Sequence, residues 1–136
     1  MYHFLDHPSE ELVEVVAASE NEVFRDAATA LFDLMTDLST IEIQESFPVQ
    51  LEASERHLLL IDWLNRLILL HEVEHVFLKD FNIQIKKDSD WSLTAVVAGE
   101  KIRDNHERRL HAKSATYGQL EWKEAGVHTV RFVIDV

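Results

Sequence analysis

Hydrophobic and polar residues recur with helical spacing in the first half of the chain, after one short strand-like run. Residues 12–17 are rich in β-branched side chains and partly alternate, which predicts a strand. Apolar residues then recur at helical spacing over residues 23–35, which predicts an amphipathic helix ending near Thr36. Ser19 and Glu22 precede this run at the spacing of a capping box, in which the Glu side chain reaches back to the cap.

A second helix is predicted after two short strands at residues 41–44 and 47–51. Ser54 is placed to cap this helix, which we expect over residues 55–70. Its apolar side chains occupy most of the circumference, and this distribution indicates a helix that is covered on most sides.

The hydrophobic period changes to two in the C-terminal half. Strands are predicted at residues 76–85 and 91–98 with a turn at 87–90, and at residues 110–122 and 127–136 with a turn at 124–126. Two helices among such strands predict an α+β fold, with two layers: a mostly antiparallel β-sheet and two main α-helices packed against it.

Length and composition indicate one domain over residues 1–136. The absence of cysteine excludes disulfides, thiolate-bound zinc and iron–sulfur clusters, and it suits a reducing compartment. We see no signal peptide and no apolar run of the roughly 20 residues that span a bilayer. A soluble, cytoplasmic protein that does not bind membranes is therefore expected.

The net charge of −12 argues against tight, sequence-independent binding of nucleic acid, because phosphate binding depends on Lys and Arg. One segment is an exception, since it holds five of the 13 basic residues: Lys101, Arg103, Arg108, Arg109 and Lys113. These residues form either a solvated face offset by nearby acids or a patch for phosphate, a nucleotide or an acidic partner.

The string from His71 through Glu72 to His75 is a literal H-E-x-x-H. In zinc proteases this pattern requires one continuous helix, so that both His rings share a face, and it requires a third ligand. The helical pattern fades at Leu70 and a strand-like run starts at Val76. We therefore expect His75 at or beyond the helix end, and a small zinc-dependent hydrolase remains the alternative function.

Acidic residues gather near both ends of the chain. Asp6, His7, Glu10 and Glu11 lie within six residues, and Asp135 precedes the last residue. Such a cluster is a solvated turn or a site for a hard cation. Oxygen ligands of this kind suit Ca²⁺, Mg²⁺ or Mn²⁺ rather than zinc.

The segment around Lys113 offers a further candidate. A strand over residues 110–122 would place His111 and Lys113 side by side, either as a charged edge that discourages aggregation or as a pair that contacts a phosphate or partner. The chain has no Walker loop, G-x-G-x-x-G or G-x-S-x-G motif, so no familiar nucleotide cradle or serine nucleophile is expected.

Taken together, several segments resemble the archease family, the protein cofactors of RtcB-type RNA ligases. The resemblance rests on FLDH at residues 4–7, VFRDAATALFDLMTD at 23–37, LLLIDWLNRLILL at 58–70, Gly99-Glu100, KSATY at 113–117 and VIDV at 133–136. The resemblance implies a non-enzymatic accessory role in tRNA splicing or RNA repair, with no catalytic residues. Archeases promote guanylylation and multiple turnover of the ligase.

The resemblance also implies a divalent metal, Ca²⁺ first and Mg²⁺ or Mn²⁺ otherwise, bound by Glu10 and Asp135. Glu10 stands where the family has Asp. Lys113 matches the functional Lys of the family, whereas His111 and Gly118 depart from its pattern. The implied partner-contact or activation residues are Lys113, Asp6, His7, Glu100 and His111. A general chaperone or modulator of another nucleic-acid enzyme is a further alternative.

Overall fold

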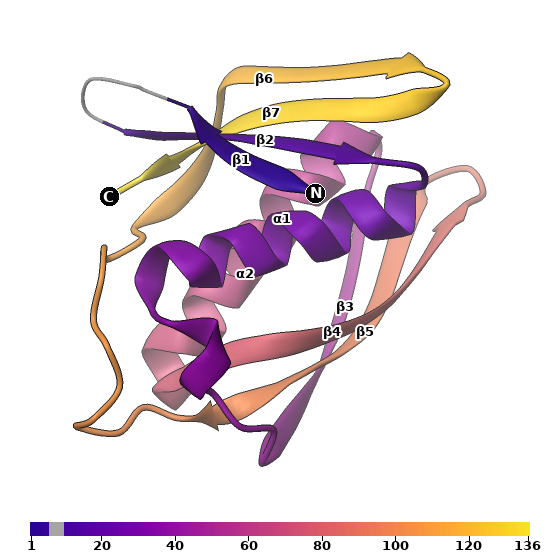
Figure 1. Ribbon diagram of the computed structural model, residues 1–136. Coiled ribbons are helices and arrows are strands. Elements are labelled where there is room, and N and C mark those ends of the chain that lie inside the picture. The colour runs from indigo at the N-terminus through magenta and orange to yellow at the C-terminus, as the bar shows by residue number, and fades with distance from the viewer. Residues whose placement is uncertain (6–9) are drawn as a thin grey trace.

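The computed structural model describes residues 1–5 and 10–136, and this part of the chain forms seven strands, two α-helices and one short 3₁₀ helix (Figure 1). In chain order these elements are β1 (Tyr2–Leu5), β2 (Glu11–Ala17), α1 (Glu20–Met35), the 3₁₀ helix Leu38–Thr40, β3 (Glu45–Ala53), α2 (Arg56–Glu74), β4 (Val76–Lys87), β5 (Trp91–Lys101), β6 (Ser114–Ala125) and β7 (Val127–Asp135). Asp6 and His7 lie outside the described residues.

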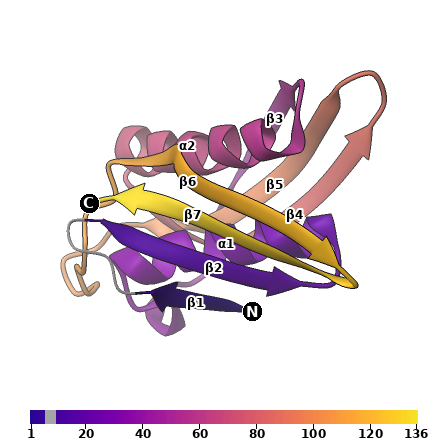
Figure 2. The same cartoon turned by 90° about the horizontal axis from the view of Figure 1, so that it is seen from above.

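The strands form two antiparallel sheets, one in the order β1-β2-β7-β6 and the other in the order β3-β5-β4. Both helices lie between the sheets: α1 packs on β2 and β4, and α2 packs on β6 and β3 (Figures 1 and 2). The α+β class and the antiparallel pairing are confirmed. The predicted two layers are replaced by sheet, helices and sheet, because the helices carry enough apolar surface to cover two sheets.

Helix α1 begins at its predicted cap. The Ser19 hydroxyl accepts a hydrogen bond from the backbone N–H of Glu22 at 3.3 Å. The Glu22 carboxylate accepts one from the N–H of Ala18 at 3.3 Å, one residue before the cap rather than at the cap itself. Two backbone donors at the start of the helix are thus satisfied locally.

Helix α2 is one turn longer than predicted, and its N-cap is Glu55, whose side chain makes no capping bond. The prediction of Ser54 as the cap is therefore wrong. The indole N–H of Trp63, which is fully buried, donates to the carbonyl of Phe24 in α1 at 3.0 Å. The wide apolar circumference of α2 follows from its position between two sheets. No helix of the described residues is long and apolar enough to cross a membrane.

Two strand predictions are corrected. Residues 41–44 are not a strand, and β3 is a single strand beginning at Glu45; Ile41 is apolar because it is buried after the 3₁₀ helix. Strand β6 begins at Ser114, not at residue 110. The backbone N–H groups of Arg109 and Leu110 donate to Met35 and Leu34 at the end of α1, and so these residues do not pair with β7.

The two ends of the chain run side by side in the four-stranded sheet. Strand β2 pairs antiparallel with β7, so the start of β2 meets the end of β7 (Figure 2). Strand β6 begins at the same end of the sheet, since Ser114 pairs with Asp135. This end of the sheet is therefore where residues from three distant parts of the sequence gather.

Candidate functional site

Glu10 and Asp135 flank the last residue pair between β2 and β7. That pair is Glu11 with Ile134, and the strands are antiparallel, so Glu10 and Asp135 are the next residues along the two segments at this end of the sheet. Both residues are partly exposed. The fold thus brings two carboxylates from opposite ends of the chain together.

The start of β6 borders Asp135 on its other side. The Ser114 hydroxyl donates to the Asp135 carboxylate at 3.2 Å, and the backbone N–H of Lys113 donates to the carbonyl of Asp135 at 2.8 Å. The side chain of Lys113 is exposed. Glu10, Asp135 and Lys113, which the sequence singles out from three segments, are therefore neighbours at one end of the sheet.

The donor set of this pair fits a hard cation better than a soft one, because the two side chains offer only oxygen atoms. Within residues 1–5 and 10–136, no group of three or more His, Cys, Asp or Glu is arranged to hold a metal ion. A cation bound by Glu10 and Asp135 would therefore need further oxygen ligands from backbone carbonyls and water, as Ca²⁺ and Mg²⁺ commonly take.

Glu100 is 1% exposed and lies inside the fold. Its carboxylate accepts hydrogen bonds from the backbone N–H of Glu42 at 3.3 Å and from His106 Nε2 at 2.7 Å, and it pairs with Arg103 at 3.3 Å. Burial alone would raise the pKa of Glu100, but the Glu42 N–H, the His106 ring and the Arg103 charge together lower it. Glu100 holds the chain after β5 in place and is not exposed to a docked protein.

His106, which follows Glu100 at a short distance in the sequence, is buried. Its Nδ1 accepts the backbone N–H of Arg103 at 2.9 Å, so in the neutral ring the proton is on Nε2 and is donated to Glu100. The short spacing between Glu100 and His106 was the available signal. It could not be interpreted without knowing that residues 102–106 form a turn.

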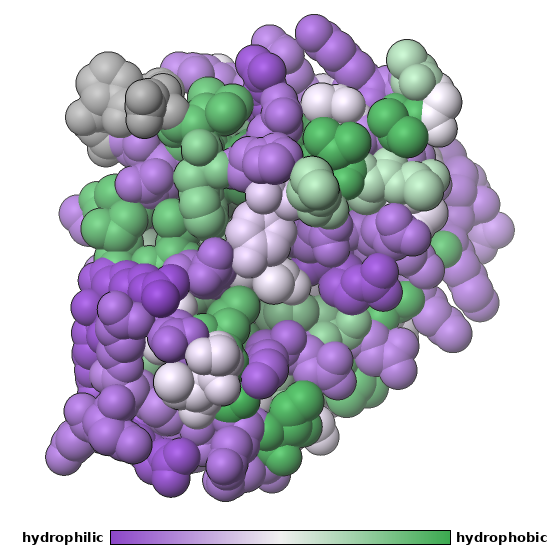
Figure 3. Space-filling model, in the orientation of Figure 1, coloured by the Kyte–Doolittle hydropathy of each residue, from purple (hydrophilic) through white to green (hydrophobic). Residues whose placement is uncertain are grey.

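The five basic residues of the segment 101–113 divide into two groups. Lys101 pairs with Glu74, Arg103 with Glu100, and Arg109 with Asp33 and Glu107. Arg108 and Lys113 form no ion pair with the residues that the structure describes. Figure 3 shows that the surface over this segment, at the lower left, is predominantly hydrophilic. The solvated-face interpretation therefore applies to three of the five residues.

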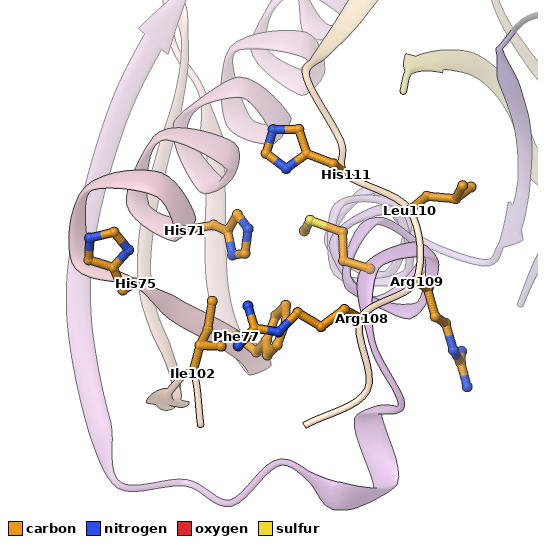
Figure 4. A pocket seen from close by; sticks show the side chains of 9 residues that line it. His71, His75, Phe77, Ile102, Arg108, Arg109, Leu110 and His111 are labelled. Atoms are coloured by element: carbon orange, nitrogen blue, oxygen red, sulfur yellow. The ribbon is translucent and has the colours of Figure 1, made fainter. Parts of the chain in front are cut away.

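The H-E-x-x-H string crosses the end of α2, as the sequence predicted. Helix α2 ends at Glu74, and His75 adopts a left-handed conformation with φ 54°. His71 is buried, and its Nδ1 lies 2.8 Å from the carbonyl of Val76. The two rings leave the helix end on different sides (Figure 4). They do not form the two-histidine face of a zinc hydrolase.

His111 does not stand beside Lys113 on a strand, and that prediction is wrong because residues 102–113 form no strand in the structure. The ring of His111 lies instead over the end of α2. Its centroid is 6.5 Å from that of His71, and its Nε2 is 3.9 Å from the Glu72 carboxylate. His111 and Lys113 are thus on the same connecting segment but belong to different sites.

Three comparisons with known proteins point to one protein family. A model of the archease protein family matches residues 2–136. Protein archease of Methanothermobacter thermautotrophicus is 37% identical over 85% of this chain and 84% of its own length, and that of Methanopyrus kandleri is 30% identical over 97% and 96%. The solution structure of Methanobacterium thermoautotrophicum protein 1598 superposes with a TM-score of 0.87 at 33% identity, covering 99% of this chain and 98% of that one.

Proposed function

Because this chain belongs to the archease family, we propose that it is a non-enzymatic accessory protein that activates an RtcB-type RNA ligase. It promotes guanylylation of the ligase and its repeated turnover in tRNA splicing or RNA repair. The observation that carries this proposal is the meeting of Glu10, Asp135 and Lys113 at one end of the four-stranded sheet. These are the positions that match the functional residues of the family.

A divalent cation, with Ca²⁺ as the first candidate, explains why two carboxylates stand together there. Adjacent carboxylates repel one another unless a cation neutralises them. Glu10 and Asp135 would hold the ion, which supplies positive charge and no redox chemistry. Bound in this way, the start of β2 and the end of β7 would form one rigid surface. Glu10 is one methylene longer than the Asp of the family but would offer the ion the same carboxylate oxygen ligands.

Lys113 adds a positive charge beside the two carboxylates. Its backbone N–H donates to the carbonyl of Asp135 and its side chain is exposed, so one partner surface can contact both the cation site and this lysine. The net charge of −12 favours association with a basic protein, such as an enzyme that handles RNA.

Carboxylate substitutions test the proposal. Glu10→Ala and Asp135→Ala should each abolish stimulation of ligase guanylylation while the thermal unfolding midpoint changes by only a few degrees. Glu52→Ala is the matched control, because Glu52 is an exposed carboxylate on the other sheet. Calorimetric titration with Ca²⁺ should give binding in the wild type and in Glu52→Ala, and none in Asp135→Ala. Full stimulation by both site variants would refute the proposal.

A further inference from the structure

A second site lies at the C-terminal end of α2, apart from the paired carboxylates. A cavity of about 240 Å³ opens between this helix end, β4 and the segment that connects β5 to β6. Figure 4 shows the residues around it. They are Met35, His71, His75, Phe77, Ile102, Arg108, Arg109, Leu110 and His111.

The lining combines hydrogen-bond donors and cations with an apolar floor, and it contains no carboxylate. Arg109 points away from the cavity and is held by Asp33 and Glu107 (Figure 4). Arg108 extends across the cavity and forms no ion pair with the residues the structure describes. Arg108 is exposed, and its guanidinium beside several imidazoles gives this part of a protein with a net charge of −12 a local positive charge that favours an anion.

The hydrogen bond of His71 sets what its ring offers to a ligand. Nδ1–H donates to the carbonyl of Val76, so Nε2 is the ring atom left for the cavity. Burial lowers the pKa of His71, and the neighbouring His111 and His75 lower it further, against the Val76 bond and Glu72, which raise it. An anion in the cavity would reverse this balance, because it favours the protonated ring, in which Nε2 becomes a donor.

The end of a helix carries a partial negative charge, which would weaken an anion site. Here two of the carbonyl groups at this end, those of Glu74 and His75, are already bound. Lys101 Nζ donates to the carbonyl of Glu74 at 2.7 Å, and the N–H of Ile102 donates to that of His75 at 2.8 Å. Glu72 faces His111 at 3.9 Å. The other acids beside the site are already paired, Glu74 with Lys101 and both Asp33 and Glu107 with Arg109.

We propose that this cavity binds a phosphate group, with the Arg108 guanidinium, His71 Nε2 and the His111 ring as its ligands. The cavity is smaller than the roughly 300–1,000 Å³ of sites for drug-sized ligands, and this size suits a single phosphate with at most a small ester group over Phe77. Planar guanidinium groups bind phosphate oxygens through paired hydrogen bonds. This phosphate-site proposal does not depend on whether the protein activates a ligase.

The test is a titration of the full chain with inorganic phosphate and, separately, with methyl phosphate, followed by NMR of the histidine rings. We expect saturable binding that shifts the His71 and His111 signals, raises the pKa of His71 and is tighter at pH 6 than at pH 8. Tighter binding of methyl phosphate would support an esterified phosphate as the ligand. Equal binding of both probes would support phosphate alone.

Two variants and one control make the titration decisive. Arg108→Gln should weaken binding about tenfold or more, as expected for the loss of a charge-assisted hydrogen bond. Arg25→Gln removes the same charge from an exposed position on α1 and should bind as the wild type does. His71→Asn can still donate to Val76 but lacks Nε2, so it should bind weakly and lose the pH dependence. No saturable binding, or equal affinity in Arg108→Gln and Arg25→Gln, would overturn the proposal.

Discussion

Glu100 illustrates, at the scale of a single residue, how an acidic side chain is stabilised inside this fold. A backbone N–H, an imidazole and a guanidinium surround a carboxylate that is almost fully enclosed. Removing a partner from a buried charged network costs about 3 kcal/mol or more, because the remaining groups are left unsatisfied. Glu100→Gln should therefore lower the free energy of unfolding at pH 7 by roughly that amount, measured by urea denaturation.

The pH dependence of stability follows from the lowered pKa of Glu100. Because the pKa in the folded state is below that in the unfolded state, the contribution is fully present above the unfolded value. It is lost as the pH falls through the folded pKa. The wild type should lose stability on acidification below about pH 4.5. Glu100→Gln should lose less over the same interval, while Glu52→Gln should follow the wild type.

Sequence alone identified some residues of the candidate site but not their surroundings. Glu10, Asp135 and Lys113 were found through family resemblance, and local spacing could not show that they meet. The pairing of Glu100 with His106 depends on a turn, and the cavity at His71 depends on a segment that packs on α1. Contacts of this kind arise from tertiary structure, which hydrophobic periodicity does not encode.

At the scale of elements, helix α1 and the strands with clear alternation were predictable, because their patterns repeat over many residues. The hydrophobic pattern does not predict strand β1, because this strand has only four residues and is stabilised by its pairing with β2. The start of β6 was placed too early because residues 109 and 110 bind the end of α1 instead. Where a pattern is short, tertiary hydrogen bonds decide the structure.

The contribution of the Ser19 cap of α1 to stability can be tested by substitution. Ser19→Ala removes the acceptor of the Glu22 N–H and should lower the free energy of unfolding by about 1 kcal/mol, within the range measured for such caps. Ser19→Asp keeps an acceptor and adds a negative charge at the helix start, so it should be as stable as the wild type. Equal losses in both variants would contradict the role of the cap.

Gly99 allows β5 to approach β4 beside the bulge between Leu78 and Asp80. A Cβ at Gly99 would lie 2.8 Å from the Cα of Leu78 and closer still to the carbonyl oxygen of Phe77. Gly99→Ala should therefore cost about 3 kcal/mol, because backbone atoms must move. In Gly118→Ala the new Cβ meets, among residues 1–5 and 10–136, only the Thr116 hydroxyl, at 3.9 Å, and thermal denaturation should show little change.

At the scale of the whole molecule, the order β1-β2-β7-β6 is what joins the two ends of the chain. The sequence predicted the class of the fold but not this order or the division into two sheets, since strand order depends on long-range pairing. The same topology places Lys113 beside Asp135 and directs residues 102–113 across the ends of both helices. The two proposed sites are thus linked by one connecting segment.

The measurement that tests the central claim most directly is guanylylation and multiple-turnover ligation by the cognate RtcB-type ligase, with and without this protein. We predict that the protein increases both the rate of guanylylation and the number of ligations per ligase, and that Asp135→Ala does neither. Equal ligase activity in the presence and absence of the wild-type protein would contradict the account.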